Sequence, residues 1–160
     1  MPTSRARPRT ESNNYIFVYG TLRAARNHDM SKVLERHADF VSRGRIPGVL
    51  YDVGPYPGAV RKSGARAFVW GDVFRLRDPE RALQILDRYE GWDEKKQPRS
   101  AEFKRSRVAV DVGSGKKVRA WIYLYNRPTD GLPLIRSGDY LKSAGTRTRA
   151  KAAKIGNRAG

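Results

Sequence analysis

The sequence predicts an α+β domain whose mixed, mostly antiparallel sheet curls into a small barrel with inserted helices. Two observations favour this class. Segments with strand character outnumber segments with helical spacing, and the helical segments interrupt the strands instead of alternating with them. A doubly wound sheet is therefore not expected, and the chain contains no internal repeat.

The first half of the chain predicts a strand, a helix and a broken stretch. A run of β-branched and aromatic residues at 14–19 predicts a buried strand that ends at Gly20 in a tight turn. A helix is expected over 29–37, where apolar residues recur every three and four positions. Six glycines and prolines interrupt residues 40–57, which predicts short strands broken by turns.

Three more strands are expected. The apolar run at 67–76 predicts a strand, and Gly71 inside it indicates a bulge or the close approach of another backbone. Alternating residues over 102–112 and 117–125 predict an antiparallel hairpin, joined by a glycine-containing loop. A last short turn of helix is expected at 139–141.

A helix should begin after Asp78, whose carboxylate can cap its free amides, with Pro79 at the first helical position. Gly91 should end it, because glycine suits the left-handed position that follows a helix. Its buried stripe is expected to contain Ala82, Leu83, Leu86 and Tyr89. Trp70 and Trp121 lie within apolar strands and are expected in the core.

The chain is strongly basic, with a formal net charge of +17. Residues 1–13 and 144–160 offer almost no apolar side chains to bury, so we expect two disordered basic arms around a domain at 14–143. Such arms commonly serve solubility. Binding of nucleic acid through them is the less favoured interpretation.

What the sequence lacks excludes several classes of site. There is no cysteine, which excludes disulfides, thiolate metal sites and a cysteine nucleophile. The two histidines, His28 and His37, are not accompanied by an acidic ligand pattern and make a poor metal pair. No apolar run is as long as a membrane helix or a signal peptide requires, so we expect a cytoplasmic protein without a membrane partner.

Five short blocks carry a resemblance to a known family: Tyr19-Gly20-Thr21-Leu22, Tyr56-Pro57-Gly58, Gly71-Asp72-Val73, Leu86-Asp87-Arg88-Tyr89-Glu90-Gly91 and Ala120-Trp121-Ile122-Tyr123. They resemble motifs of the gamma-glutamylcyclotransferase-like (AIG2-like) family, in the family's order. Each block is weak alone, but each falls on the type of element that the residue pattern predicts. The resemblance implies the barrel fold and an enzyme that releases 5-oxoproline and an amine from a gamma-glutamyl amine, amide or peptide.

The resemblance also implies roles for particular residues. Glu90 matches the family's catalytic acid/base, and the loop formed by Tyr19, Gly20, Thr21 and Leu22 matches the one that holds the glutamyl head. Backbone amides freed by Gly20 would receive the carboxylate of that head. The implied reaction requires no metal, no cofactor and no nucleophilic side chain.

The residues themselves leave alternatives open. Most glutamates near a helix end are solvated, but an acid at the negative end of the helix dipole is placed at a cost, as functional residues often are. Members usually carry Tyr-x-Arg after the glutamate, and the matching segment here begins with Phe103, which has no hydroxyl. The alternatives are a non-catalytic small-molecule binding module of the same fold and a nucleic-acid-associated protein that uses its basic arms.

Overall fold

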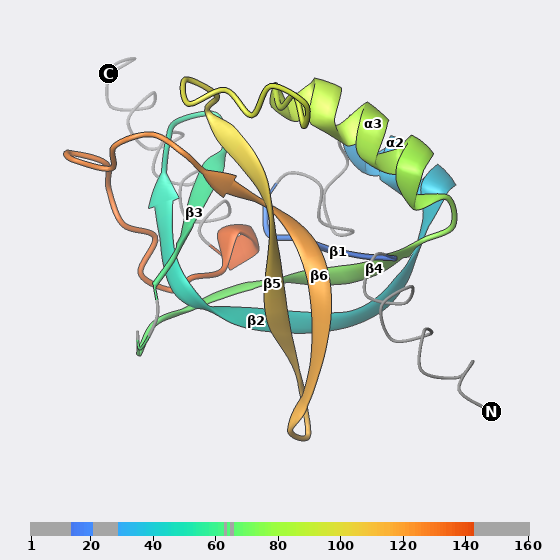
Figure 1. Cartoon of the computed structure of the whole chain (residues 1–160). Helices are drawn as coiled ribbons and strands as arrows, with labels where there is room; N and C mark the ends of the chain where they lie inside the picture. Colours follow the sequence, from blue (N-terminus) through green and yellow to red (C-terminus); the bar gives the residue numbers. More distant parts are fainter. Residues whose placement is uncertain (1–13, 21–28, 63, 65, 143–160) are drawn as a thin grey trace, which may run out of the picture.

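The computed structural model describes residues 14–20, 29–62, 64 and 66–142 (Figure 1). The expected arms, and Thr21 and Leu22, lie outside the described residues, and the limits of the domain stay a prediction. The elements are β1 (Tyr15–Val18), α2 (Asp29–His37), β2 (Ala38–Asp52), β3 (Pro57–Arg61), β4 (Phe68–Leu76), α3 (Pro79–Glu90), β5 (Phe103–Gly113) and β6 (Lys116–Tyr125).

Five strands form a closed barrel in the order β2-β4-β1-β6-β5. The barrel closes where Arg45 of β2 pairs with Asp111 of β5. The strand pairs are antiparallel except for β1 and β6, which run parallel, and β3 extends the sheet beside the last residues of β2. The prediction of a mixed, mostly antiparallel sheet curled into a small barrel is confirmed.

The prediction of short, broken strands at 40–57 is wrong for most of that stretch, because β2 runs through it as one strand of 15 residues. Its glycines serve close packing. A Cβ at Gly44 would lie 2.5 Å from a valine side chain of β5, and one at Gly48 would lie 2.6 Å from a backbone oxygen of β3. The expected turn follows only at 53–56, where the Val53 amide donates to the Tyr56 carbonyl.

The other strand predictions agree with the structure. β5 and β6 pair in continuous register from Phe103 and Tyr125 to Asp111 and Lys117, and the register shifts by one residue just before the hairpin loop. Gly71 of β4 is a close approach, since a Cβ there would lie 2.3 Å from the carbonyl oxygen of Val18. A short helical turn occupies residues 140–142. Among the helices of the described chain, none is long and apolar enough to cross a membrane.

Two apolar clusters stabilise the fold. The first fills the barrel and contains Val69, Val110 and Ile122. The second lies between the barrel and the two helices, which cover the outer face beside β1 and β4 (Figure 1), and contains Leu34 of α2 and Leu86 of α3. Burial of such side chains is worth about 1.5–3 kcal/mol each, so both helices are fixed by their apolar faces.

The two tryptophans expected in the core are half-buried on the outer face of the barrel; Trp121 packs against the edge of the second apolar cluster, whereas Trp70 belongs to neither cluster. The guanidinium of Arg43 lies 5.0 Å from the ring centre of Trp70, and that of Arg107 lies 4.4 Å from the ring centre of Trp121. Arginines thus cover the outward side of these rings, and the cation–π contact accounts for their incomplete burial in the core.

Helix α3 has the expected ends. The Asp78 carboxylate accepts the Arg81 amide, and Gly91 adopts the left-handed conformation with φ 75°. Ala82, Leu83 and Leu86 are buried as predicted, but Tyr89 is 44% exposed, which contradicts its assignment to the buried stripe. In the last turn of α3, Tyr89 lines a pocket instead of the core.

Candidate active site

A cavity of about 330 Å³ opens beside the end of β1 and the last turn of α3. Four segments that are distant in the sequence contribute its walls, together with Tyr123 of β6. The lining residues are Phe17, Val18, Tyr19, Gly20, Tyr56, Pro57, Tyr89, Glu90, Glu102, Phe103 and Tyr123. The described lining residues are mostly aromatic, with two carboxyl groups and without a lysine or arginine.

Glu90 is the last residue of α3 and is half-buried in this wall. Burial, and to a smaller extent the negative charge of Glu102, raise its pKa from 4.5 to about 7. The left-handed Gly91 ends the helix directly after Glu90, so the carboxyl stands at the negative end of the helix dipole. Near neutral pH this group is therefore able both to accept and to give up a proton.

Tyr19 and Gly20 form the opposite part of the wall. The buried Tyr19 hydroxyl donates to the carbonyl of Tyr123 at 2.7 Å and accepts the amide of Ala59 at 3.1 Å. Burial raises the pKa of Tyr19 far above its usual range. Its hydroxyl is occupied by the protein, so Tyr19 fixes the corner at the end of β1 and contributes its ring to the cavity.

Gly20 packs tightly in that corner. A Cβ at this position would lie 3.0 Å from a ring carbon of Pro57, on the neighbouring segment. Gly20 and Glu90 thus border the same cavity, as the sequence interpretation required. The amides of Thr21 and Leu22 belong to the part of the loop outside the described residues, so their contact with an anion stays a prediction.

Asp87 connects the last turn of α3 to the barrel. Its carboxylate accepts the Tyr123 hydroxyl at 2.7 Å and the Nε of Arg105 at 2.9 Å. The side chains of Arg105 and Asp87 are only 9% and 13% exposed, so this ion pair is largely shielded from water. Because Asp87 precedes Glu90 by less than one helical turn, the network holds the end of α3 that carries Glu90.

Glu102 and the Tyr56 hydroxyl were not found from the sequence. The Tyr56 hydroxyl donates to Glu102 at 2.5 Å, which raises the pKa of Tyr56 to about 12. A guanidinium nitrogen of Arg127 lies 3.7 Å from the other Glu102 oxygen. No local pattern identifies such a pair, although Tyr56 belongs to one of the resembling blocks.

Phe103, the residue without the usual hydroxyl, is part of an aromatic group in this wall. Its ring centre lies 5.7 Å from those of Tyr56 and Tyr125. Arg105, two residues later, is the arginine that holds Asp87. The segment 103–105 therefore combines an apolar contact with the cavity and an ion pair behind it.

The site contains a titratable carboxyl in an aromatic cavity, with no group of potential metal ligands within the described chain. One half-buried carboxyl with a pKa near neutrality faces a space large enough for a small polar molecule. Fold and site together define a small closed-barrel protein with an acid-bearing, aromatic pocket.

The chain belongs to the gamma-glutamyl cyclotransferase, AIG2-like family, whose family model matches residues 16–142. It is 36% identical over 129 residues to the gamma-glutamylcyclotransferase family protein YtfP of Escherichia coli K12, and the match covers 79% of this chain and 95% of that protein. It is 28% identical over 130 residues to the putative gamma-glutamylcyclotransferase MJ1514 of Methanocaldococcus jannaschii, covering 79% and 94%.

Solved structures agree with this membership. The solution NMR structure of ytfP from Escherichia coli superposes with a TM-score of 0.56 at 32% identity, covering 81% of this chain and 98% of that one. The crystal structure of an AIG2-like protein from Mus musculus superposes with a TM-score of 0.60 at 23% identity, covering 78% and 86%. The second likeness concerns the fold alone.

Proposed function

We propose that this protein is an enzyme that converts a gamma-glutamyl amine, amide or peptide into 5-oxoproline and a free amine. Membership of the family supports the general activity. The observation that carries the reaction is the half-buried Glu90 carboxyl, with a pKa of about 7, in the wall of the cavity that also contains Gly20.

The reaction is an intramolecular acyl transfer. The α-nitrogen of the glutamyl group attacks the γ-carbonyl carbon, a C–N bond closes a five-membered lactam, and the γ-amide C–N bond breaks. The α-nitrogen enters as an ammonium and loses two protons, and the leaving nitrogen gains two and departs as an ammonium. No net proton is consumed, so the enzyme must only move protons between two nitrogens held close together.

Glu90 is the proposed proton carrier. Its carboxylate takes a proton from the α-ammonium, which frees the nitrogen for attack, and its carboxylic acid returns a proton to the leaving nitrogen. A pKa of about 7 suits both steps, because acid and base forms are then present in similar amounts. Nucleophile and carbonyl share one molecule, so holding the substrate bent supplies much of the remaining rate.

The walls of the cavity indicate how the substrate would lie. We infer that the glutamyl head binds at the Tyr19–Gly20 corner, with its carboxylate towards the amides of Thr21 and Leu22. The leaving amine would then extend along the aromatic wall of Tyr56 and Phe103. Phe103 has no hydroxyl group, so it would contact the amine only through its apolar ring. A comparison of turnover among gamma-glutamyl compounds with different leaving amines would identify that amine.

The test is a screen of gamma-glutamyl amines, amides and peptides for release of 5-oxoproline, with wild type beside Glu90→Gln. Glu90→Gln keeps the shape of the side chain and removes proton transfer, so turnover should fall by about 10²–10⁴-fold while binding persists. Glu35→Gln, which removes one exposed carboxyl of α2, is the charge-matched control and should retain wild-type turnover.

The same experiment separates the enzyme from a binding module of the same fold. If wild type binds gamma-glutamyl compounds in calorimetry but releases 5-oxoproline from none of them, the protein is a binder and the proposed reaction is wrong. Equal turnover by wild type and Glu90→Gln would instead retain the reaction and remove Glu90 as its proton carrier.

A further inference from the structure

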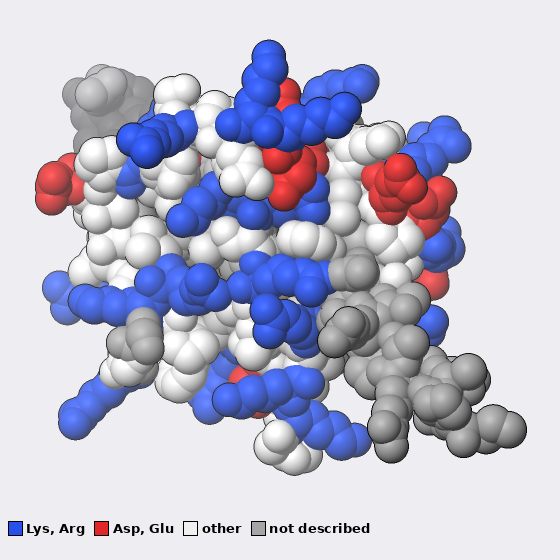
Figure 2. Space-filling model, viewed as in Figure 1, with Lys and Arg blue, Asp and Glu red and all other residues white. Residues whose placement is uncertain are grey.

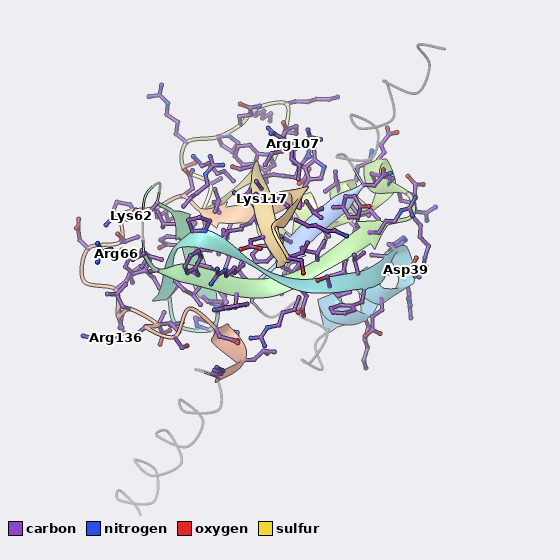
Figure 3. All side chains as sticks on the ribbon, turned by 90° about the horizontal axis from the view of Figure 1, so that it is seen from below. Asp39, Lys62, Arg66, Arg107, Lys117 and Arg136 are labelled. Carbon is purple, nitrogen blue, oxygen red and sulfur yellow. The ribbon has the colours of Figure 1, made fainter. Side chains whose placement is uncertain are left out.

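Basic side chains gather on the outer face of the barrel where β5 and β6 form their hairpin (Figure 2). We define the hairpin face as Arg61, Arg107, Lys117 and Arg119. Viewed from below, with the hairpin tip towards the viewer, Arg107 and Lys117 lie near the centre on the hairpin, whereas Asp39 lies at the right-hand edge, away from the hairpin (Figure 3). Lys62 and Arg66 continue the positive charge beyond the end of β3.

The strand register explains why these cations share one face. Arg107 is opposite Trp121, the next outward pair is Ala109 and Arg119, and Lys117 comes next on β6. Side chains two residues apart on a strand point to the same side and are about 6.6 Å apart. Arg61 joins them from β3, since its guanidinium donates to the Arg107 carbonyl at 2.8 Å.

The arginines of this face are crowded. Burial lowers the pKa of Arg107, and the charges of Arg119 and Arg105 lower it further. Arg105 and Arg107 both cover the Trp121 ring, at 4.5 and 4.4 Å from its centre. Like charges held this close repel one another, and an anion bound over them would relieve that repulsion.

Few acids offset this charge. Asp111 lies opposite Lys117 in the hairpin but bonds to Arg45 at 3.3 Å. The acids near Arg105 are Asp87 and Glu94, which it pairs with at 2.9 and 3.5 Å. Arg61, Lys117 and Arg119 take part in none of the ion pairs of the described chain. The face therefore presents an excess of positive charge to a partner.

We propose that the hairpin face binds the phosphodiester backbone of a nucleic acid duplex. The cations are spread over the convex outside of a barrel and do not converge on one point, so they suit a repeating anion better than a single small one. A duplex carries one negative charge per about 1.7 Å of its axis, so its closely spaced phosphates can contact several of these cations at once. Because such contacts are made to phosphates and not to base edges, the binding is independent of the nucleic acid sequence.

Two other partners fit less well. Single-strand binders stack bases on open aromatic rings within a groove, but here the Trp121 ring is covered by arginines. Proteins that lie on membranes insert apolar side chains beside their cations. The exposed large apolar residues of the described chain lie outside the hairpin, at Phe40, Val41, Tyr89 and Leu134.

The test measures binding of the full-length protein to a short fluorescent DNA duplex of random sequence by anisotropy, from about 50 to 200 mM NaCl. Wild type is compared with a triple variant, Arg61→Gln, Lys117→Gln and Arg119→Gln, whose side chains are exposed. A second triple variant, Arg81→Gln, Lys95→Gln and Lys96→Gln, removes the same charge from exposed positions on and after α3. All three proteins keep both basic arms, so any contribution of the arms is common to them.

The hairpin-face variant should bind the duplex at least about tenfold more weakly, and its plot of log K against log salt should be shallower by about 2 to 3, since each phosphate contact contributes about 0.9. The α3 variant should match wild type. Thermal unfolding checks that each variant is folded. Three results would overturn the proposal. They are an equal loss of affinity in both variants, no duplex binding by wild type at low salt, and tighter binding of wild type to a single strand, to phosphatidylserine vesicles or to polyglutamate than to the duplex.

Discussion

Replacing Glu90 with glutamine should stabilise the protein above neutral pH while removing its proposed proton carrier. In the folded protein the pKa of Glu90 is about 7, compared with an ordinary value of 4.5. Between these two values the folded state holds a proton that the unfolded state has lost, so the free energy of unfolding falls as pH rises. Glutamine never ionises and does not incur this loss.

The magnitude follows from the two pKa values. One pKa unit is worth about 1.4 kcal/mol, so the difference between about 7 and 4.5 corresponds to about 3 kcal/mol. The carboxyl is half-buried, which makes this an upper figure. The stability of Glu90→Gln minus that of wild type should therefore be constant below about pH 4.5, grow through the interval, and level off above about pH 7 at up to about 3 kcal/mol more.

Urea unfolding of both proteins at a series of pH values measures this difference directly. Subtracting the two curves cancels the titration of all other groups to the extent that they are independent of residue 90. Glu35→Gln again controls for the loss of one negative charge. A difference between Glu90→Gln and wild type that does not change from pH 4 to 8 would mean that the Glu90 carboxyl is solvated, and both the pKa and its proposed role would have to be abandoned.

Three further substitutions test the electrostatic interactions and the packing around the site. Glu102→Gln removes a charge that raises the pKa of Glu90, so the acid limb of the pH–rate profile should move to lower pH; an unchanged profile would contradict the electrostatic coupling. Gly71→Ala should lower the free energy of unfolding by about 3 kcal/mol in urea, because the new Cβ would lie 2.3 Å from the Val18 oxygen, and a neutral result would show that the strands can separate there. Asp87→Asn removes the nearer counter-charge of the largely buried Arg105 guanidinium and leaves only the more exposed Glu94 at 3.5 Å, so it should lower that free energy by about 2–3 kcal/mol, whereas a loss below about 0.5 kcal/mol would mean that the Arg105–Asp87 pair is well solvated.

Local sequence patterns predicted most elements correctly because local physics decides them. The ends of α3 were predicted from Asp78, Pro79 and Gly91. In the structure Asp78 is the N-cap, Pro79 is the first helical residue and Gly91 is the C-cap. The position of Glu90 at that helix end followed from the same residues. Its place in a cavity beside Gly20 depended on the resemblance, because periodicity alone does not show which helix end meets which strand end.

The errors arose where one residue type serves two purposes. Glycine permits turns, but it also permits close contact, and the sequence does not distinguish Gly44 in a continuous strand from a turn residue. Trp121 fits an apolar core pattern but only partly packs against the core, and arginines from the neighbouring strand cover it on the outside. In both cases the deciding partner is remote in the chain, and only the closed barrel brings it near.

The two carboxyl groups of the cavity have different surroundings, and these surroundings decide which of them is suited to proton transfer. Glu102 accepts the Tyr56 hydroxyl and lies near Arg127, so its negative charge has a donor and a cation beside it. The surroundings of Glu90 consist of burial and the charge of Glu102, and both oppose ionisation. Glu90 thus holds its proton to a higher pH than an ordinary glutamate does, and the charge of Glu102 contributes to that. This division gives a pocket with two acids a single group suited to carry protons at neutral pH.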